Sequence, residues 1–232
     1  MFDLYIANKN YSSWSLRPWV LLKALEIPFN EHLMPFEGGF GDSYTTFKRF
    51  SPSGLVPCLV DNDHNVAVWD SLAIVEYVAE THPNVWPQER EARAWARSAS
   101  AEMHSGFGAL RDECSMNCGV RVAMNELSPG LKSNLARLDA LWQEGLTRFG
   151  GPFLAGERFT AVDAFYAPVA FRVQTFNLPL SDASLAYVKR LLALPAMQDW
   201  YAAALQETWR EPMHEAETVK HATLLSDERA IG

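Results

Sequence analysis

Apolar and polar positions in the first part of the chain follow two different spacings. Short apolar runs at residues 2–7 and 29–34 predict two strands. Between them, residues 16–25 repeat apolar positions at helical spacing, and Pro28 stops that helix. A strand, a helix and a second strand in this order predict a crossover that leaves the two strands parallel.

A hairpin and a further helix follow in the same region. Apolar runs at residues 56–60 and 66–69 flank the turn Asp61-Asn62-Asp63-His64, which predicts an antiparallel pair. A helix is expected from Ser71 to about Glu80, and the stretch before the hairpin is expected to be an irregular or helical link. The first eighty residues therefore predict a small mixed sheet with helices packed on it.

The second half of the chain is dominated by helical spacing. Residues 81–87 contain two prolines and are expected to link a domain of residues 1–80 to an all-helical domain of residues 88–232. One long helix is predicted by apolar residues spaced three or four apart before Gly150-Gly151: Leu131, Leu135, Leu138, Trp142, Leu146 and Phe149.

Three further features complete the helical half. Thr160 and Asp163 have capping-box spacing at the start of another helix. Pro195 is expected to separate helices at 186–194 and 196–206. The last ten residues, from Thr223, show no periodicity and are expected to be irregular.

Charge and apolar content exclude two classes of partner. The chain has 28 acidic and 20 basic side chains, for a net charge of -8, and no run of Lys and Arg. Nucleic acid is therefore not expected as a partner. No apolar run reaches the roughly 20 residues that a membrane helix needs, and residues 1–7 lack the basic leader of a signal peptide. We expect no membrane association.

Cysteine usage favours a reducing compartment. The chain has three cysteines and no C-x-x-C pair, which disfavours both a disulfide framework and a zinc site. Cys114 and Cys118 are four residues apart, a spacing that would place them on one helical face, but no His or Asp neighbours complete a metal tetrahedron. We expect these thiols to pack as small apolar groups in a cytoplasmic protein without a metal.

The turn from Asn8 to Arg17 carries the first candidate chemistry. Ser12, Ser13 and Ser15 stand between a strand and a helix, where free N–H groups and the helix dipole favour an anion. A hydroxyl here can donate to a bound thiolate and lower its pKa. Spacing alone favours the simpler alternative that these serines only cap the helix.

Two other segments of the first domain are candidates for ligand contacts. Pro57 opens an apolar strand after Val56, and a cis peptide there would turn backbone groups toward a peptide ligand, although a trans proline is statistically favoured. Asp70 and Ser71 begin the helix after the hairpin. They either cap that helix or hold an α-amino acid, with Asp70 on the ammonium and Ser71 on the carboxylate.

Taken together and in this order, the three segments resemble the soluble glutathione transferase superfamily over about residues 2–210. Ser12-Ser13-Trp14-Ser15-Leu16-Arg17 looks most like the Ser-Ser-Cys-Ser-x-Arg signature of the zeta class, which includes maleylacetoacetate isomerases. Val56-Pro57 matches the family's cis-proline site, Asp70-Ser71 its γ-glutamyl site, and residues 160–163 its capping box. The resemblance implies a thioredoxin-like α/β domain followed by an all-α domain.

The same resemblance implies roles for single residues. Ser12 would hydrogen-bond the glutathione sulfur, with Ser13 or Ser15 in support. The backbone of Val56, beside Pro57, would pair with the cysteinyl part, and Asp70 and Ser71 would hold the γ-glutamyl end. Glutathione is the implied co-substrate, and the family is usually dimeric, so a homodimer is expected.

A cleft lined by the helical domain would take the second substrate. Candidates for its lining are Trp14, Met103, His104, Phe107, Arg111 and Arg172. Among them, His104 is a candidate for proton transfer, and Arg111 is a candidate for contact with a partner subunit.

Two departures from the zeta pattern concern Trp14 and Arg172. Trp14 replaces the signature cysteine. In zeta isomerases a carboxylate-binding arginine directly precedes a phenylalanine in the helix after the capping box, whereas this chain has Thr175-Phe176 with Arg172 one turn earlier. The departures weaken an isomerase assignment more than a transferase assignment.

The leading hypothesis is a glutathione transferase that acts on a small, apolar electrophile through a serine-activated thiol. The alternatives are a maleylacetoacetate-type cis-trans isomerase and a non-catalytic glutathione-binding module. A glutathione-linked thiol oxidoreductase would need a cysteine from outside the turn.

Overall fold

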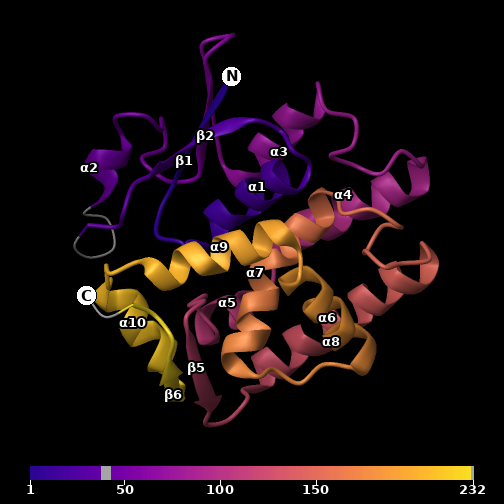
Figure 1. The fold of residues 1–232 in the computed structure, drawn as a ribbon. Coiled ribbons are helices and arrows are strands. Elements are labelled where there is room, and N and C mark those ends of the chain that lie inside the picture. The colour runs from indigo at the N-terminus through magenta and orange to yellow at the C-terminus, as the bar shows by residue number, and fades with distance from the viewer. Residues whose placement is uncertain (38–42, 231–232) are drawn as a thin grey trace.

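The computed structural model describes residues 1–37 and 43–230, in which a small sheet with its helices lies against a mostly helical half (Figure 1). The elements of the first part are β1 (Phe2–Ile6), α1 (Ser13–Ala24), β2 (Phe29–Leu33), α2 (Ser43–Phe47), β3 (Cys58–Asp61), β4 (Val66–Trp69) and α3 (Ser71–Ala79). Those of the second part are α4 (Arg90–Ser105), α5 (Gly108–Glu113), β5 (Val120–Met124), α6 (Pro129–Arg148), α7 (Ala161–Phe176), α8 (Asp182–Leu192), α9 (Pro195–Gln206), α10 (Pro212–Val219) and β6 (Ala222–Asp227).

The N-terminal sheet has the strand order β2-β1-β3-β4. β1 pairs in parallel with β2, and β3 pairs antiparallel with both β1 and β4, so the predicted crossover and hairpin are confirmed. Leu4 and Ile6 of β1 are fully buried, which fixes one face of the strand against the core. The chain leaves β1 through a short turn and enters α1 directly.

Helix α7 is the centre of the C-terminal half. All of its residues except Gln174 are buried, and it packs on α1 and α4, so it joins the two halves through one core. The predicted capping box is confirmed, because the Thr160 N–H donates to Asp163 Oδ2 at 2.9 Å. The Leu154 N–H and the Tyr187 hydroxyl also donate to Asp163, at 3.0 and 2.8 Å.

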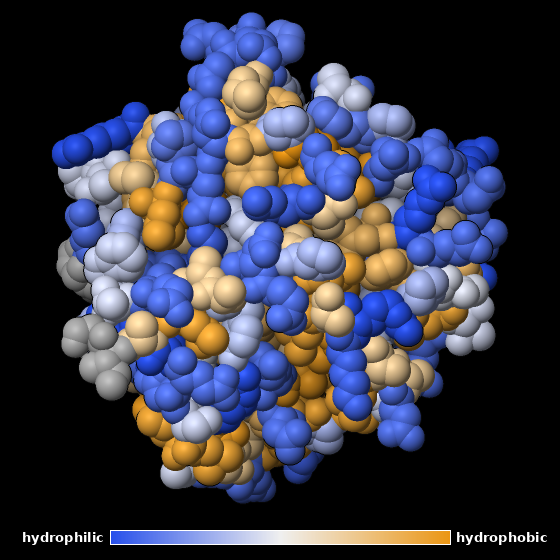
Figure 2. Space-filling view, in the orientation of Figure 1, coloured by the Kyte–Doolittle hydropathy of each residue, from blue (hydrophilic) through white to orange (hydrophobic). Residues whose placement is uncertain are grey.

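The C-terminal half is mostly helical, as expected, but it also contains a two-stranded sheet. The prediction that residues from Thr223 are irregular was wrong, because β6 pairs antiparallel with β5. Local periodicity hides this strand, since its partner lies about a hundred residues earlier and both Leu224 and Leu225 are exposed. Figure 2 shows apolar atoms gathered at the lower left of the view, where Figure 1 places β6.

Cys114 and Cys118 do not share a helical face as their spacing suggested. Cys114 ends α5, and Cys118 lies in the turn before β5. Two residues of α7 hold this stretch instead: Arg172 donates to the Cys114 carbonyl at 2.7 Å and Thr175 to the Asn117 carbonyl at 2.7 Å. All three cysteines of the chain are free and buried.

Candidate functional site

The serine turn lies between β1 and α1. The N–H groups of Tyr11 and Ser12 both donate to the Asn8 carbonyl, at 3.1 and 2.9 Å. Ser12 occupies the N-cap position of α1, but its side chain makes no capping hydrogen bond. The residue is 5% exposed, and its hydroxyl donates instead to Ser15 Oγ at 2.7 Å. The Ser12 side chain therefore does not cap α1 in this structure.

Ser13 is contacted from the central helix. Arg172 of α7 lies 3.4 Å from Ser13 Oγ through its Nη2 atom, and its Nε donates to the Cys114 carbonyl. Burial, followed by the charge of Arg111, lowers the pKa of Arg172 to about 10. Arg172, which stands one turn earlier than the arginine of the zeta pattern, thus reaches the serine turn.

Trp14 contacts two arginines. The guanidinium carbon of Arg17 lies 4.0 Å from the centre of the Trp14 ring, and that of Arg111 lies 4.9 Å from it. Arg111 also donates to the carbonyl of Gly106 at 3.0 Å. Its guanidinium therefore contacts Trp14 of its own chain.

Arg17 is the residue that sequence reasoning missed, although it ends the Ser-Ser-x-Ser-x-Arg signature. It is fully buried, and its Nη1 lies 3.4 Å from Ser71 Oγ at the start of α3. Its Nε has no hydrogen-bond partner among the described residues. Burial, with the charges of Arg111 and Arg172, lowers the pKa of Arg17. Arg17 therefore connects the serine turn to the expected γ-glutamyl site.

Asp70 and Ser71 form the start of α3. Asp70 Oδ1 accepts from the N–H of Leu72 at 2.8 Å and of Ala73 at 3.4 Å, so Asp70 does cap this helix. Its other oxygen lies 3.4 Å from His104 Nε2 of α4. One carboxylate oxygen is used for capping, and the second faces the helical half.

The Val56–Pro57 peptide bond is cis, which decides the alternative that the sequence left open. The ladder between β3 and β1 begins only at Cys58, paired with Tyr5. The backbone of Val56 therefore stands outside the ladder.

The expected residues of α4 and the following bend fall into two groups. The His104 ring meets the Trp14 ring edge-on, with centroids 5.2 Å apart, so it lies beside the serine turn. Burial, with the charges of Arg17 and Arg111, lowers the pKa of His104, while Asp70 opposes this effect. Met103 and Phe107 are buried in the core. Phe107 also has a left-handed backbone, with φ at 58°, where the chain bends into α5.

The charge around the serine turn is positive. The charges of Arg111 and Arg172 lower the pKa of Arg17, and the charge of Arg111 also lowers that of Arg172, while Asp70 acts on Arg17 in the opposite direction. Within the described ranges, no group of three or more His, Cys, Asp or Glu side chains is arranged to hold a metal ion. No helix within them is long and apolar enough to cross a membrane. The arrangement favours an anionic ligand at the start of α1.

Comparisons with known proteins show which family the chain belongs to. Residues 11–81 match the family description "Glutathione S-transferase, N-terminal domain", and residues 93–203 match "Glutathione S-transferase, C-terminal domain". The chain belongs to the glutathione S-transferase family. The expected enzyme class, a glutathione transferase with glutathione as co-substrate, agrees with this membership.

Individual relatives share less than a third of their residues with this transferase. It is 28% identical to a probable maleylacetoacetate isomerase of Caenorhabditis elegans, over 77% of this chain and 81% of that protein. It is 29% identical to a probable maleylacetoacetate isomerase of Vibrio cholerae, over 84% of this chain and 94% of that protein.

Among solved structures, a glutathione transferase homolog from Burkholderia gl BGR1, with bound glutathione, superposes with a TM-score of 0.66. It shares 22% identity and covers 88% of this chain and 97% of its own. This likeness confirms the fold.

Proposed function

We propose that this transferase activates the thiol of glutathione through the Ser12 hydroxyl. The observation that carries the proposal is that Ser12 stands at the N-cap of α1 without capping it, with its hydroxyl committed only to a second hydroxyl, that of Ser15. A thiolate is a stronger acceptor than a neutral hydroxyl, so bound sulfur would compete for the Ser12 proton.

The size of the effect follows from ordinary hydrogen-bond energies. A hydrogen bond to a charged group contributes about 1.5–3 kcal/mol. Since one pKa unit corresponds to about 1.36 kcal/mol, this lowers the pKa of a thiol by about one to two units. A thiol with an ordinary pKa of about 8.5 would then ionise near neutral pH.

The remaining part of the proposed site orients glutathione. The free backbone of Val56, before the cis Pro57, would pair with the cysteinyl part. Ser71 would hold the γ-glutamyl carboxylate, and we add Arg17 to it, because Arg17 already contacts Ser71 and has an unpaired Nε. The second oxygen of Asp70, which does not cap α3 and faces His104 Nε2 at 3.4 Å, would take the ammonium group.

A second candidate function is a glutathione-dependent isomerase of the maleylacetoacetate type. The arginine cluster favours it, because Arg111 and Arg172 would attract a carboxylate on the second substrate, whereas an apolar electrophile needs neither. Turnover of a neutral aryl halide and of a cis-unsaturated keto acid would be compared in wild type and Arg172→Met. Loss of keto acid turnover alone supports the isomerase, and equal effects on both substrates support the transferase.

The test of the thiol proposal is an ultraviolet difference titration of bound glutathione in wild type, Ser12→Ala and Ser13→Ala. We expect Ser12→Ala to raise the thiol pKa by about one unit or more and Ser13→Ala to leave it near the wild-type value. An unchanged thiol pKa in Ser12→Ala would refute the role of Ser12. Glutathione binding without turnover of any electrophile would support a non-catalytic module instead.

We further propose that the protein is a cytoplasmic homodimer. Three free, buried cysteines suit a reducing compartment. Trp69, which is 45% exposed beside a mostly apolar hollow along β4 and α3, gives a second subunit a surface to bury. Sedimentation equilibrium tests the dimer, and a single monomeric species at micromolar concentration would contradict it.

A further inference from the structure

The residues just before Ser12 are held by the far end of the chain. The N–H groups of Lys9 and Asn10 donate to the two oxygens of one carboxylate, that of Glu207, at 2.6 and 3.1 Å. The Asn10 side-chain amide donates to the same residue at 3.1 Å and to the Ala204 carbonyl at 2.6 Å. The Lys9 carbonyl accepts from Trp200 Nε1 at 2.9 Å. Helix α9 and the residue after it therefore fix the backbone of this turn.

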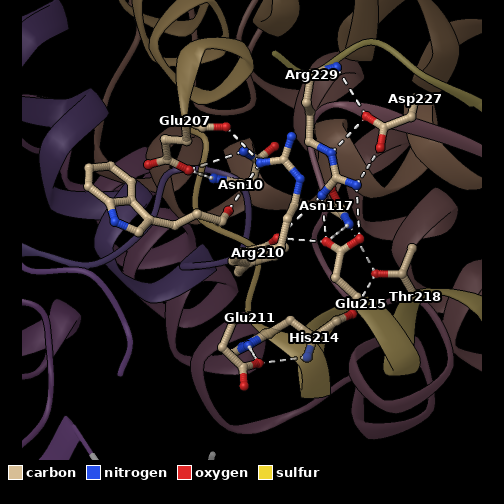
Figure 3. A network of polar contacts seen from close by, with 12 residues as sticks. Asn10, Asn117, Glu207, Arg210, Glu211, His214, Glu215, Thr218, Asp227 and Arg229 are labelled. Carbon is tan, nitrogen blue, oxygen red and sulfur yellow. Dashed lines mark hydrogen bonds and ion pairs between the residues drawn. The ribbon is translucent and has the colours of Figure 1, made fainter. Parts of the chain in front are cut away.

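A second set of contacts fixes Tyr11. Its hydroxyl donates to Glu215 of α10 at 2.6 Å, and Arg229 lies 3.3 Å from the same hydroxyl. Arg229 pairs with Glu215 at 2.8 Å and with Asp227 at 2.7 Å. Figure 3 shows Arg229 between Glu215 of α10 and Asp227 at the end of β6, with Glu207 and Asn10 to one side of them. We call Glu207, Glu215 and Arg229 the C-terminal clasp.

Burying the Glu207 carboxylate costs more free energy than a purely structural contact at this place would need. Glu207 is 4% exposed, and burying a carboxylate is unfavourable unless its oxygens are fully hydrogen-bonded. Burial accordingly raises the pKa of Glu207, while the three bonds from Lys9 and Asn10 oppose that effect. An apolar side chain would close the end of α9 without this cost. Unlike an apolar side chain, the carboxylate fixes the orientation of two consecutive backbone N–H groups.

Fixing the backbone of the turn also fixes the position of Ser12. Lys9, Asn10 and Tyr11 are the three residues before Ser12, and each is bonded to the C-terminal segment. The N–H of Ser12 itself is held by the Asn8 carbonyl at the start of the same turn. Because a hydrogen bond weakens steeply with misalignment, a shift of this turn would weaken a bond from the Ser12 hydroxyl to sulfur.

We propose that the C-terminal clasp positions the active turn, with Glu207 as its principal positioning residue. The segment from Glu207 to Arg229, which lies beyond the family match at residues 93–203, is then part of the thiol-activating apparatus. The inference rests on the proposed role of Ser12 and assigns what keeps Ser12 in place.

The test measures the thiol pKa of bound glutathione in Glu207→Gln and Tyr11→Phe. Glutamine retains one acceptor oxygen but turns an NH₂ group toward a backbone N–H, so it removes at least one of the three bonds that Glu207 accepts from Lys9 and Asn10. Glu217→Gln is the matched control, because Glu217 is exposed on α10. Affinity for S-methylglutathione, which has no thiol, reports glutathione binding apart from thiol activation.

We expect Glu207→Gln to raise the thiol pKa of bound glutathione by about half a unit to one unit, which from a value near 7 lowers the thiolate fraction at neutral pH by about twofold to fivefold. Tyr11→Phe should produce a smaller rise, and Glu217→Gln none. Affinity for S-methylglutathione should stay within about twofold of wild type. An unchanged thiol pKa in a folded Glu207→Gln, or a parallel loss of S-methylglutathione affinity, overturns the proposal.

Two controls keep the outcome decisive. If Glu207→Gln does not fold, Tyr11→Phe decides alone, because it removes a single hydroxyl, and an unchanged pKa in it overturns the proposal. Ser12→Ala is titrated beside them. If Ser12→Ala leaves the thiol pKa unchanged, the proposed function fails; if only the clasp variants leave it unchanged, the clasp inference fails and the role of Ser12 stands.

Discussion

Trp14 replaces the cysteine of the zeta signature, and the structure gives it a role that a cysteine cannot fill. Its ring contacts both the Arg17 and the Arg111 guanidinium groups, whose central carbons lie 4.0 and 4.9 Å from the ring centre. We predict that Trp14→Leu, which keeps an apolar side chain but removes the aromatic face, destabilises the protein by leaving two neighbouring cations without their shared partner.

The magnitude follows from the burial of the two arginines. A cation–π contact of a desolvated guanidinium contributes about 2 kcal/mol, which applies to the fully buried Arg17. The half-buried Arg111 contributes about 1 kcal/mol. The combined loss of about 3 kcal/mol corresponds to a fall in melting temperature of about 6–12 °C for a chain of this length.

The assay is urea unfolding of Trp14→Leu, Arg111→Met and the double variant. We expect a coupling free energy of about 1 kcal/mol between Trp14 and Arg111, because each variant removes the same contact. Trp209→Leu is the control and should change stability by less than about 0.5 kcal/mol, since Trp209 is half exposed. Additive effects, or a loss in Trp14→Leu no larger than in the control, would refute the proposed stacking.

Three more predictions concern titratable groups. Hydrogen bonds from Arg229 lower the pKa of Asp227, so this pair stabilises the fold above about pH 4, and the stabilisation is lost as the pH falls through the lowered pKa. Hydrogen exchange near the C-terminus should therefore rise in acid, and Arg229→Leu should make that rise smaller. Since burial and two arginines lower the pKa of His104, its NMR titration should fall below 6.5 and move upward in Arg111→Met; a shift downward would contradict the arrangement. Burial raises the pKa of all three cysteines, so a thiol reagent should modify them only after unfolding, and rapid reaction of the native protein would revive a thiol-exchange function.

Local periodicity was enough to predict the N-terminal half. The apolar runs mark β1, α1 and the hairpin of β3 and β4, and their order determines the parallel and antiparallel pairings. The same pattern could not show β6, because that strand gains its hydrogen bonds from a partner far away in the sequence.

The candidate site was predictable only in part, for the same reason. Ser12 and Ser71 stand at helix starts that a sequence pattern can mark. The contacts that distinguish the site from two simple caps are long-range: Ser13 meets Arg172 across 159 residues, and Lys9 meets Glu207 across 198. Arg17 is local but ambiguous, since a buried arginine cannot be told from an exposed one by spacing alone.

The most direct test of the account is a crystal structure of the protein with glutathione. The account predicts that the sulfur lies within hydrogen-bonding distance of Ser12 Oγ, and that the γ-glutamyl carboxylate lies against Ser71 and Arg17. A sulfur bonded to Ser13 or Ser15, with the Ser12 hydroxyl still bonded to Ser15 Oγ, would contradict it.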